Sequence, residues 1–169
     1  MRPEDAKVIA DFLLSMLEHE TKTTAGVLAV VPSDKLDYQP DHKSKSALGL
    51  VRHITLEDEW ILNSVAEGRF GSAPDHSDAC GIMTPRDAVA RYNQRLPLAM
   101  GRVRALSGDA LVRPIDFFGT VLPAVVVLSV MLRHSIHHRG QLSNYLRPMG
   151  GKVPPIYGPT ADTETAAAG

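Results

Sequence analysis

The sequence predicts an all-α protein, a four-helix bundle with long crossover connections between its helices. Apolar residues recur at helical spacing in four segments of roughly 20 to 25 residues, the pattern of bundle helices. Prolines and glycines separate these segments, and no convincing run alternates as the strands of a ladder do. The chain has 169 residues, 44% of them hydrophobic and 22% charged, an ordinary globular balance. We expect one domain at 1–160 and a flexible tail at 161–169.

The first helix is expected from about Pro3 to Leu28. Its wide apolar stripe consists of two rows that each repeat every four residues, Val8, Phe12 and Met16 beside Ile9, Leu13 and Leu17. Pro32 and Pro40 forbid its continuation, so residues 33–45 are expected to cross to the next helix as a polar loop.

The second helix is expected to begin at Ser46, a good N-cap, and to end at Gly68. Its core-facing row is formed by Leu50, Ile54, Ile61 and Val65. The adjoining row carries His53, Glu57 and Trp60, which places His53 at the edge of the apolar stripe. Residues 57–59 are otherwise expected to be a solvated acidic face, with Glu57 alone directed towards His53.

The third helix has a clear start, because Thr84 can cap it, Pro85 suits its first position and Asp87 completes a capping box. Pro97 should kink it near Asn93. Residues 107–122 are expected to form an extended segment or a short hairpin across the bundle.

The fourth helix is expected from about Pro123 to Leu146 or Arg147. Its first half is apolar nearly all round, which predicts burial on two sides, against the bundle and against a second copy of the chain in a homodimer.

Charge, cysteine content and hydropathy argue against nucleic-acid binding, disulfide bonds, secretion and a membrane span. The net charge of −1 gives no sign of a nucleic-acid-binding face. Cys80 is the only cysteine, so no disulfide can form within the chain and a reducing cytoplasmic location is the expectation. The N-terminus lacks the apolar stretch of a signal peptide, and the longest apolar run, 121–132, is too short to cross a membrane.

Three histidines carry the functional prediction. At roughly 100° per residue, His134 and His138 lie one turn apart on the same face of the fourth helix. Two imidazoles so arranged can share a divalent transition metal, and His53 on the second helix is the best candidate for a third ligand. A metalloprotease is disfavoured, because its motif needs a glutamate where this chain has Ser135.

The remaining histidines and the single thiol are expected to lie outside the site. His19 is expected at the surface and His42 and His76 in solvated loops, while His137 should lie behind the ligands or at an interface. Cys80 is expected to be an incidental thiol.

Three neutral nitrogen ligands leave a metal at least one open position, which is typical of a catalytic site. A water or a thiol bound at that position loses its proton more easily, so hydrolysis and thiol transfer are the two candidate reactions. Glu57, one turn beyond His53, is the candidate catalytic residue, as a fourth ligand, a hydrogen-bond acceptor behind a ligand, or a proton acceptor. A non-catalytic, metal-binding dimer is the third alternative.

The chain resembles the DinB family over roughly residues 8–160, most clearly in 134–147 (HSIHHRGQLSNYLR) and 150–159 (GGKVPPIYGP). Further similarities are Val31–Pro32, Tyr38–Gln39–Pro40 and 46–54 (SALGLVRHI).

The resemblance implies a DinB/YfiT-like bundle, commonly dimeric, that binds nickel or zinc through the residues matching His53, His134 and His138. It also implies a small-molecule substrate and one of two activities. The leading one is a thiol-dependent S-transferase that uses a low-molecular-weight thiol as cosubstrate on a small electrophile, and the alternative is a hydrolase.

Overall fold

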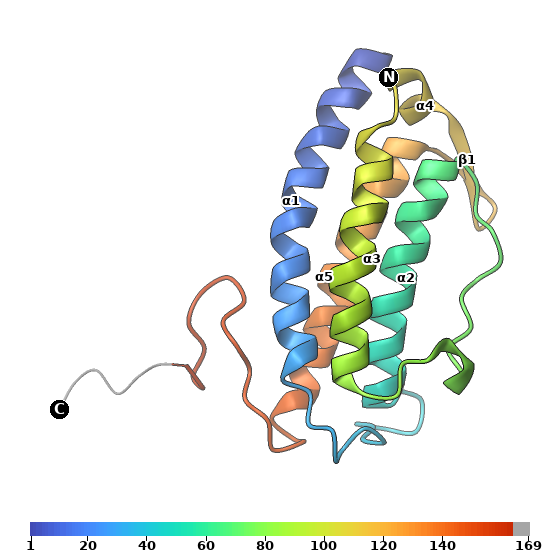
Figure 1. The fold of residues 1–169 in the computed structure, drawn as a ribbon. Coiled ribbons are helices and arrows are strands. Elements are labelled where there is room, and N and C mark those ends of the chain that lie inside the picture. The colour runs from blue at the N-terminus through green and yellow to red at the C-terminus, as the bar shows by residue number, and fades with distance from the viewer. Residues whose placement is uncertain (164–169) are drawn as a thin grey trace.

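Four long helices form the body of the protein in a computed structural model that describes residues 1–163 (Figure 1). They are α1 (Pro3–Ala29), α2 (Ala47–Glu67), α3 (Pro85–Arg104) and α5 (Ala124–Leu146). The shorter elements are η1 (Asp78–Cys80), α4 (Gly108–Val112), β1 (Pro114–Phe117) and β2 (Thr120–Pro123). The predicted four-helix bundle is confirmed.

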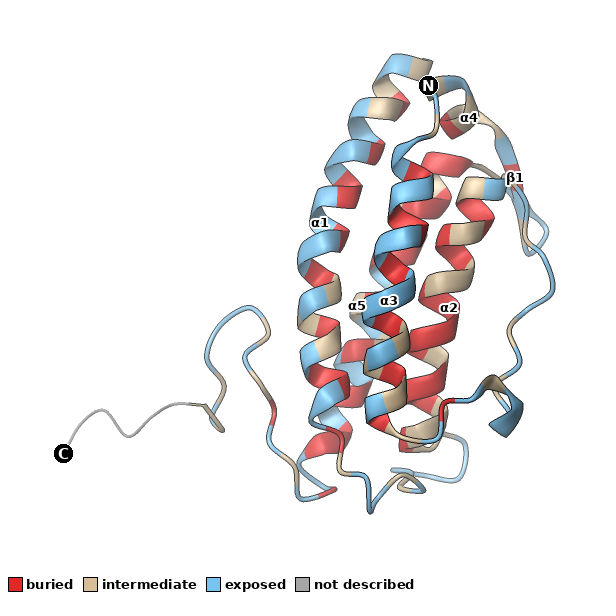
Figure 2. Ribbon diagram, viewed as in Figure 1, coloured by how far each residue is buried: buried red, intermediate tan, exposed pale blue. Residues whose placement is uncertain are grey.

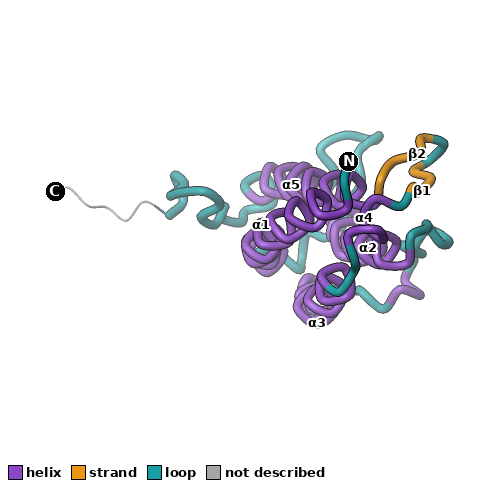
Figure 3. The backbone as a smooth tube through the Cα atoms, turned by 90° about the horizontal axis from the view of Figure 1, so that it is seen from above, coloured by secondary structure: helices purple, strands orange, loops and turns teal. Residues whose placement is uncertain are grey.

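The connections between the long helices are crossovers, as predicted. Helix α1 packs on α3 and α5, and α2 packs on the same two helices, so α1 and α2 lie diagonally across the bundle (Figure 3). Residues 68–84 run the length of the bundle before α3 begins, and α2 and α3 therefore point the same way (Figure 1). This arrangement makes α2 and α5 neighbours, which brings His53 and the histidines of α5 to one interface.

The predicted helix ends are confirmed by their capping contacts. The Ser46 hydroxyl accepts a hydrogen bond from the Gly49 amide, and Gly68 ends α2 in the left-handed conformation at a φ of 74°. Thr84 and Asp87 form a reciprocal capping box at the start of α3. Helix α3 then continues through Pro97 to Arg104.

Helix α1 buries only part of the predicted apolar stripe, since Leu13 and Leu17 are buried but the row of Val8 and Phe12 is not. Its core contacts come from Ala6, Ala10, Leu13, Leu14 and Leu17, which form the buried stripe in Figure 2. Val8 and Phe12 are 69% and 63% exposed, so the prediction that their row faces the core is wrong. The small side chains of Ala6 and Ala10 lie on the packed side of α1, and the larger apolar residues beside them face outward.

A hairpin occupies the second half of the segment predicted to be an extended stretch or a short hairpin. Strands β1 and β2 pair antiparallel, with Phe117 opposite Thr120, and Phe118 and Gly119 make the turn at φ values of 52° and 86°. The short helix α4 before it was not predicted. Helix α5 begins directly after Pro123 and ends at Leu146, as expected.

The chain beyond α5 returns alongside the bundle. Asp162 accepts hydrogen bonds from the Arg147 side chain and the Val153 amide at 2.9 and 3.0 Å. The remainder of the predicted flexible tail, residues 164–169, lies outside the described part of the chain.

In residues 1–163, none of the helices combines the length and the apolar character needed to span a membrane.

Candidate metal centre

Helices α2 and α5 bring His53, His134 and His138 together. The Nε2 atom of His53 lies 3.1 Å from Nε2 of His138 and 3.3 Å from Nε2 of His134. Ligands about 2.0 to 2.1 Å from a shared ion, at angles between octahedral and tetrahedral, lie about 2.9 to 3.4 Å apart. The observed separations therefore suit one ion held by three nitrogens.

The other ring nitrogen of each histidine faces an oxygen atom. His134 Nδ1 lies 3.2 Å from Asp58 Oδ1, and His138 Nδ1 lies 2.7 Å from Gln141 Oε1. His53 Nδ1 is 3.9 Å from Glu57 Oε1, which is too far for a hydrogen bond, and it has no hydrogen-bond partner in the described part of the chain.

For His134 and His138 this arrangement favours the tautomer that carries its proton on Nδ1, because each Nδ1 faces an oxygen acceptor within hydrogen-bond distance. The Nε2 atoms of these two residues then keep their lone pairs, and both lie within 3.3 Å of His53 Nε2. A metal ion among the three nitrogens would accept these lone pairs. The donor set thus fits a divalent transition metal.

Asp58 supports the centre from inside the bundle. Its side chain is fully buried, and its second oxygen accepts a hydrogen bond of 2.8 Å from the Tyr92 hydroxyl on α3. Burial and the charge of Asp58 hold the pKa of Tyr92 well above its usual value, so the hydroxyl keeps its proton and remains a donor. The chain Tyr92–Asp58–His134 fixes the orientation of that imidazole.

The expectation that Asp58 belongs to a solvated face is therefore wrong. Asp58 follows Ile54 by four residues and precedes Ile61 by three, so it lies on the core row of α2. A single acidic residue in an apolar row was the signal that could have identified it.

Glu57 lies behind His53 and contacts a histidine that was expected to be solvated. Glu57 Oε1 is 3.2 Å from His76 Nε2, and the His76 side chain is 32% exposed. Burial raises the pKa of Glu57, an effect that His76 opposes. His53, Glu57 and His76 form a second cluster that shares His53 with the first. The prediction that His76 is solvated in its loop is thus wrong.

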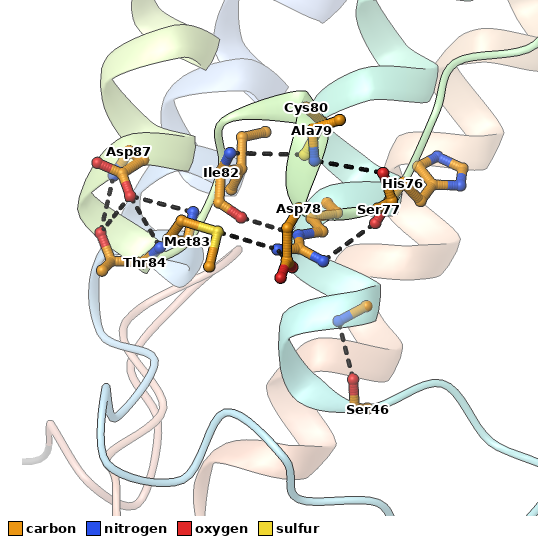
Figure 4. Close-up of polar contacts among 12 residues, drawn as sticks. Ser46, His76, Ser77, Asp78, Ala79, Cys80, Ile82, Met83, Thr84 and Asp87 are labelled. Carbon is orange, nitrogen blue, oxygen red and sulfur yellow. Dashed lines mark hydrogen bonds and ion pairs between the residues drawn. The ribbon is translucent and has the colours of Figure 1, made fainter.

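The buried side chain of Arg52 holds the loop that carries His76. Figure 4 shows His76 and Asp78 of this loop. The Arg52 guanidinium donates to the carbonyl oxygens of Ile82 and His76 at 2.8 and 3.1 Å and to Asp78 Oδ1 at 2.7 Å. These bonds connect α2 to residues 24 to 30 positions away in sequence. Sequence periodicity contains no signal for such a contact, which explains why His76 was missed.

The environment of His53 and His138 favours the neutral form of both imidazoles. Burial, and then the neighbouring His138 and His134, lower the pKa of His53 to about 3. Burial also lowers the pKa of His138. Neutral imidazole is the form that binds a metal ion.

Comparison with known proteins agrees with this architecture. Residues 7–167 match the sequence model of the DinB family. The chain belongs to the DinB family. It is 28% identical over 130 residues to an uncharacterized protein, YjoA of Bacillus subtilis, a match that covers 75% of this chain and 82% of YjoA.

Solved DinB-like structures share the fold. A DinB-like protein from Bacillus cereus superimposes with a TM-score of 0.72 at 20% identity, covering 86% of this chain and 95% of that one. YfiT from Bacillus subtilis, described as a probable metal-dependent hydrolase with an unusual four-helix bundle topology, gives 0.67 at 15% identity, covering 85% and 89%.

The other histidines and the thiol of this DinB protein lie apart from both clusters. His19 and His42 are exposed, as expected. His137 is exposed and its ring centroid is 4.8 Å from that of His138, but it belongs to neither cluster. Cys80 is a half-buried free thiol in η1 and offers no atom to either group.

Proposed function

We propose that this DinB protein is a metal-dependent enzyme in which His53, His134 and His138 hold one divalent ion, nickel or zinc. The observation that carries the proposal is the approach of three Nε2 atoms, of which His53 Nε2 lies 3.1 and 3.3 Å from the other two. When bound, an ion with three protein ligands supplies a Lewis-acidic open position that lowers the pKa of a thiol or a water. Asp58 and Gln141 orient two of the ligands by accepting their Nδ1 protons.

Glu57 is proposed as the acid–base residue of the site, and its position suggests how it acts. It lies on the Nδ1 side of His53, away from the nitrogen that faces His134 and His138. This position favours an acceptor behind His53 over a fourth ligand. Replacement by glutamine separates the two remaining roles. A positioning role predicts weaker metal binding, whereas a role as proton acceptor predicts unchanged metal binding and a lower kcat.

Thiol transfer is the reaction that we propose, with a low-molecular-weight thiol as cosubstrate and a small electrophile as substrate. Cys80, the only cysteine of the chain, is in neither histidine cluster, so the protein does not supply the nucleophile from its own thiol. Hydrolysis is the second candidate, favoured by the description of YfiT as a probable metal-dependent hydrolase. A metal-binding bundle without catalytic activity is the third.

Cobalt substitution distinguishes these candidates. Thiol transfer predicts that titration of the cobalt-loaded protein with a small thiol changes its visible absorption, with saturation at one thiol per chain. The matched control is His138→Ala, which should hold less cobalt and show no such change. A wild-type spectrum that the thiol leaves unaltered would rule out thiol transfer and leave hydrolysis or the non-catalytic alternative.

A homodimer is also proposed, now with a different candidate surface. Val125 and Val127 at the start of α5 are buried by their own chain, whereas Val8 and Phe12 of α1 remain exposed. Contiguous exposed apolar residues mark interaction sites more often than free surface.

We propose the cytoplasm as the location of the protein, because its single cysteine is a free thiol.

A further inference from the structure

A cavity lies beside the histidine cluster, in the groove between the start of α2 and the end of α5. Its volume is about 280 Å³. His138 contributes to its wall, as do Leu50 and Gln141, so the cavity borders the proposed metal centre at one of its three ligands. The loop before α2 covers its outer side with Lys43 and Lys45. The cavity is large enough for a small metabolite.

Both lysines present ammonium groups that have no ion-pair or hydrogen-bond partner among residues 1–163. Within residues 1–163 they enter hydrogen bonds through backbone atoms alone. The Lys43 amide donates to Asp41 Oδ1 at 2.8 Å, and the Lys45 carbonyl accepts from the Tyr145 hydroxyl at 3.2 Å. These bonds fix the loop backbone while the charged ends of both side chains stay available to a ligand.

Among the residues that the structure describes, no acidic side chain lines the cavity to compensate these charges. The nearest acid of the loop, Asp41, is occupied by the amides of Lys43 and Ser44 and by the Ser44 hydroxyl. The mouth of the site is therefore positively charged.

The backbone at the start of α2 cannot take over this role. The first amides of the helix are already used, since Ala47 and Leu48 donate to the carbonyls of Tyr38 and Leu36 and Gly49 donates to Ser46. Recognition of a ligand's charge at this mouth must then come from the lysine side chains. The Gln141 amide group, whose oxygen faces His138, has its NH₂ donors left for the same ligand.

We propose that the molecule entering this cavity is a small carboxylate-bearing anion, held by Lys45 with help from Lys43 and oriented by Gln141. The inference rests on the proposed function and adds the chemical class of the substrate to it. One carboxylate of the substrate would pair with Lys45 at the mouth, while its reactive carbon is directed past His138 to the centre. The cavity thus selects against neutral and cationic molecules of the same size.

Direct binding tests the proposal without reference to turnover. The probe is succinate, a dianion near neutral pH, and succinamide is its neutral counterpart of similar size. Binding to the metal-loaded protein is measured by isothermal titration calorimetry. We expect succinate to bind about tenfold more tightly than succinamide. Lys45→Gln should weaken the binding of succinate about tenfold. Raising KCl from about 0.05 to about 0.3 M should weaken binding of succinate but not of succinamide.

The matched control is Lys35→Gln, an exposed lysine of the same loop that does not line the cavity. It should leave succinate binding unchanged. Equal binding of succinate and succinamide, no binding of succinate, or binding that persists in Lys45→Gln would each overturn the proposal. Succinate that binds the metal directly gives the last of these results.

Metal content of the same samples separates this proposal from the proposed function. Metal present without anion selectivity refutes the lysine site and leaves the metal site intact. Anion selectivity that depends on Lys45 in protein that never binds a metal supports the lysine site and refutes the metal-dependent enzyme.

Discussion

Replacing Asp58 with asparagine tests the buried support of the metal centre. Asp58 accepts two hydrogen bonds, from Tyr92 at 2.8 Å and from His134 Nδ1 at 3.2 Å, and its side chain is fully buried. Asparagine has the same shape but only one acceptor oxygen. Its NH₂ group must then face one of the two donors.

The expected cost follows from that mismatch. A buried donor left without an acceptor costs about 1 to 3 kcal/mol of stability. Loss of a partner behind a metal-bound histidine typically weakens metal binding by about 10- to 100-fold, or about 1.4 to 2.8 kcal/mol. We therefore expect Asp58→Asn to fold, with a lower free energy of unfolding, and to lose metal affinity within that range.

The assay is competition for zinc against a coloured chelator, with urea unfolding of the metal-free protein measured in parallel. Tyr92→Phe is the matched control, because it removes the hydroxyl but leaves the contact between Asp58 and His134. It should destabilise the fold by about 1 kcal/mol and change zinc affinity less than threefold. A folded Asp58→Asn protein that binds zinc as tightly as wild type would refute the reasoning.

Three further predictions concern the fold, the charge state and the assembly. Glu20→Ala leaves the buried guanidinium of Arg139 without its carboxylate partner and should lower the free energy of unfolding by about 3 to 5 kcal/mol, measured in urea; an effect under 1 kcal/mol would contradict this. The metal-free protein should lose stability as the pH falls from 6.5 towards about 3. In this range His53 becomes protonated in the unfolded chain but stays neutral in the folded protein, where its pKa is about 3. The His53→Gln variant should show a shallower fall in thermal unfolding over that range, and an identical slope would argue against the shift. Phe12→Glu should convert the proposed dimer into a monomer in light scattering, whereas a dimer that survives would exclude the exposed row of α1 as its interface.

Local signals in the sequence were sufficient to predict the four long helices. Ser46, Gly68 and the Thr84–Asp87 capping box are contacts between residues close in sequence, so their types and spacing determine them. The convergence of His53 with His134 and His138 was also predictable, because each lies at the edge of an apolar row and such rows pack against each other in a bundle.

The remaining features depend on packing that no local pattern specifies. The choice of face on α1 was mispredicted because Val8, Phe12 and Ile9 fit a helical stripe as well as Ala6 and Ala10 do. His76 reaches Glu57 only because Arg52 holds a distant loop in place. Tyr92 contributes to the centre from α3, across the bundle from the helices that carry the histidines.

X-ray absorption of the zinc-loaded protein tests the central idea most directly. One zinc per chain is expected, with three imidazole nitrogens at about 2.0 to 2.1 Å and at least one further light-atom ligand from outside the protein. His138→Ala should lose one imidazole from this shell or lose the zinc. A zinc shell with fewer than two imidazoles in the wild-type protein, or one that His138→Ala leaves unchanged, would contradict the three-histidine centre.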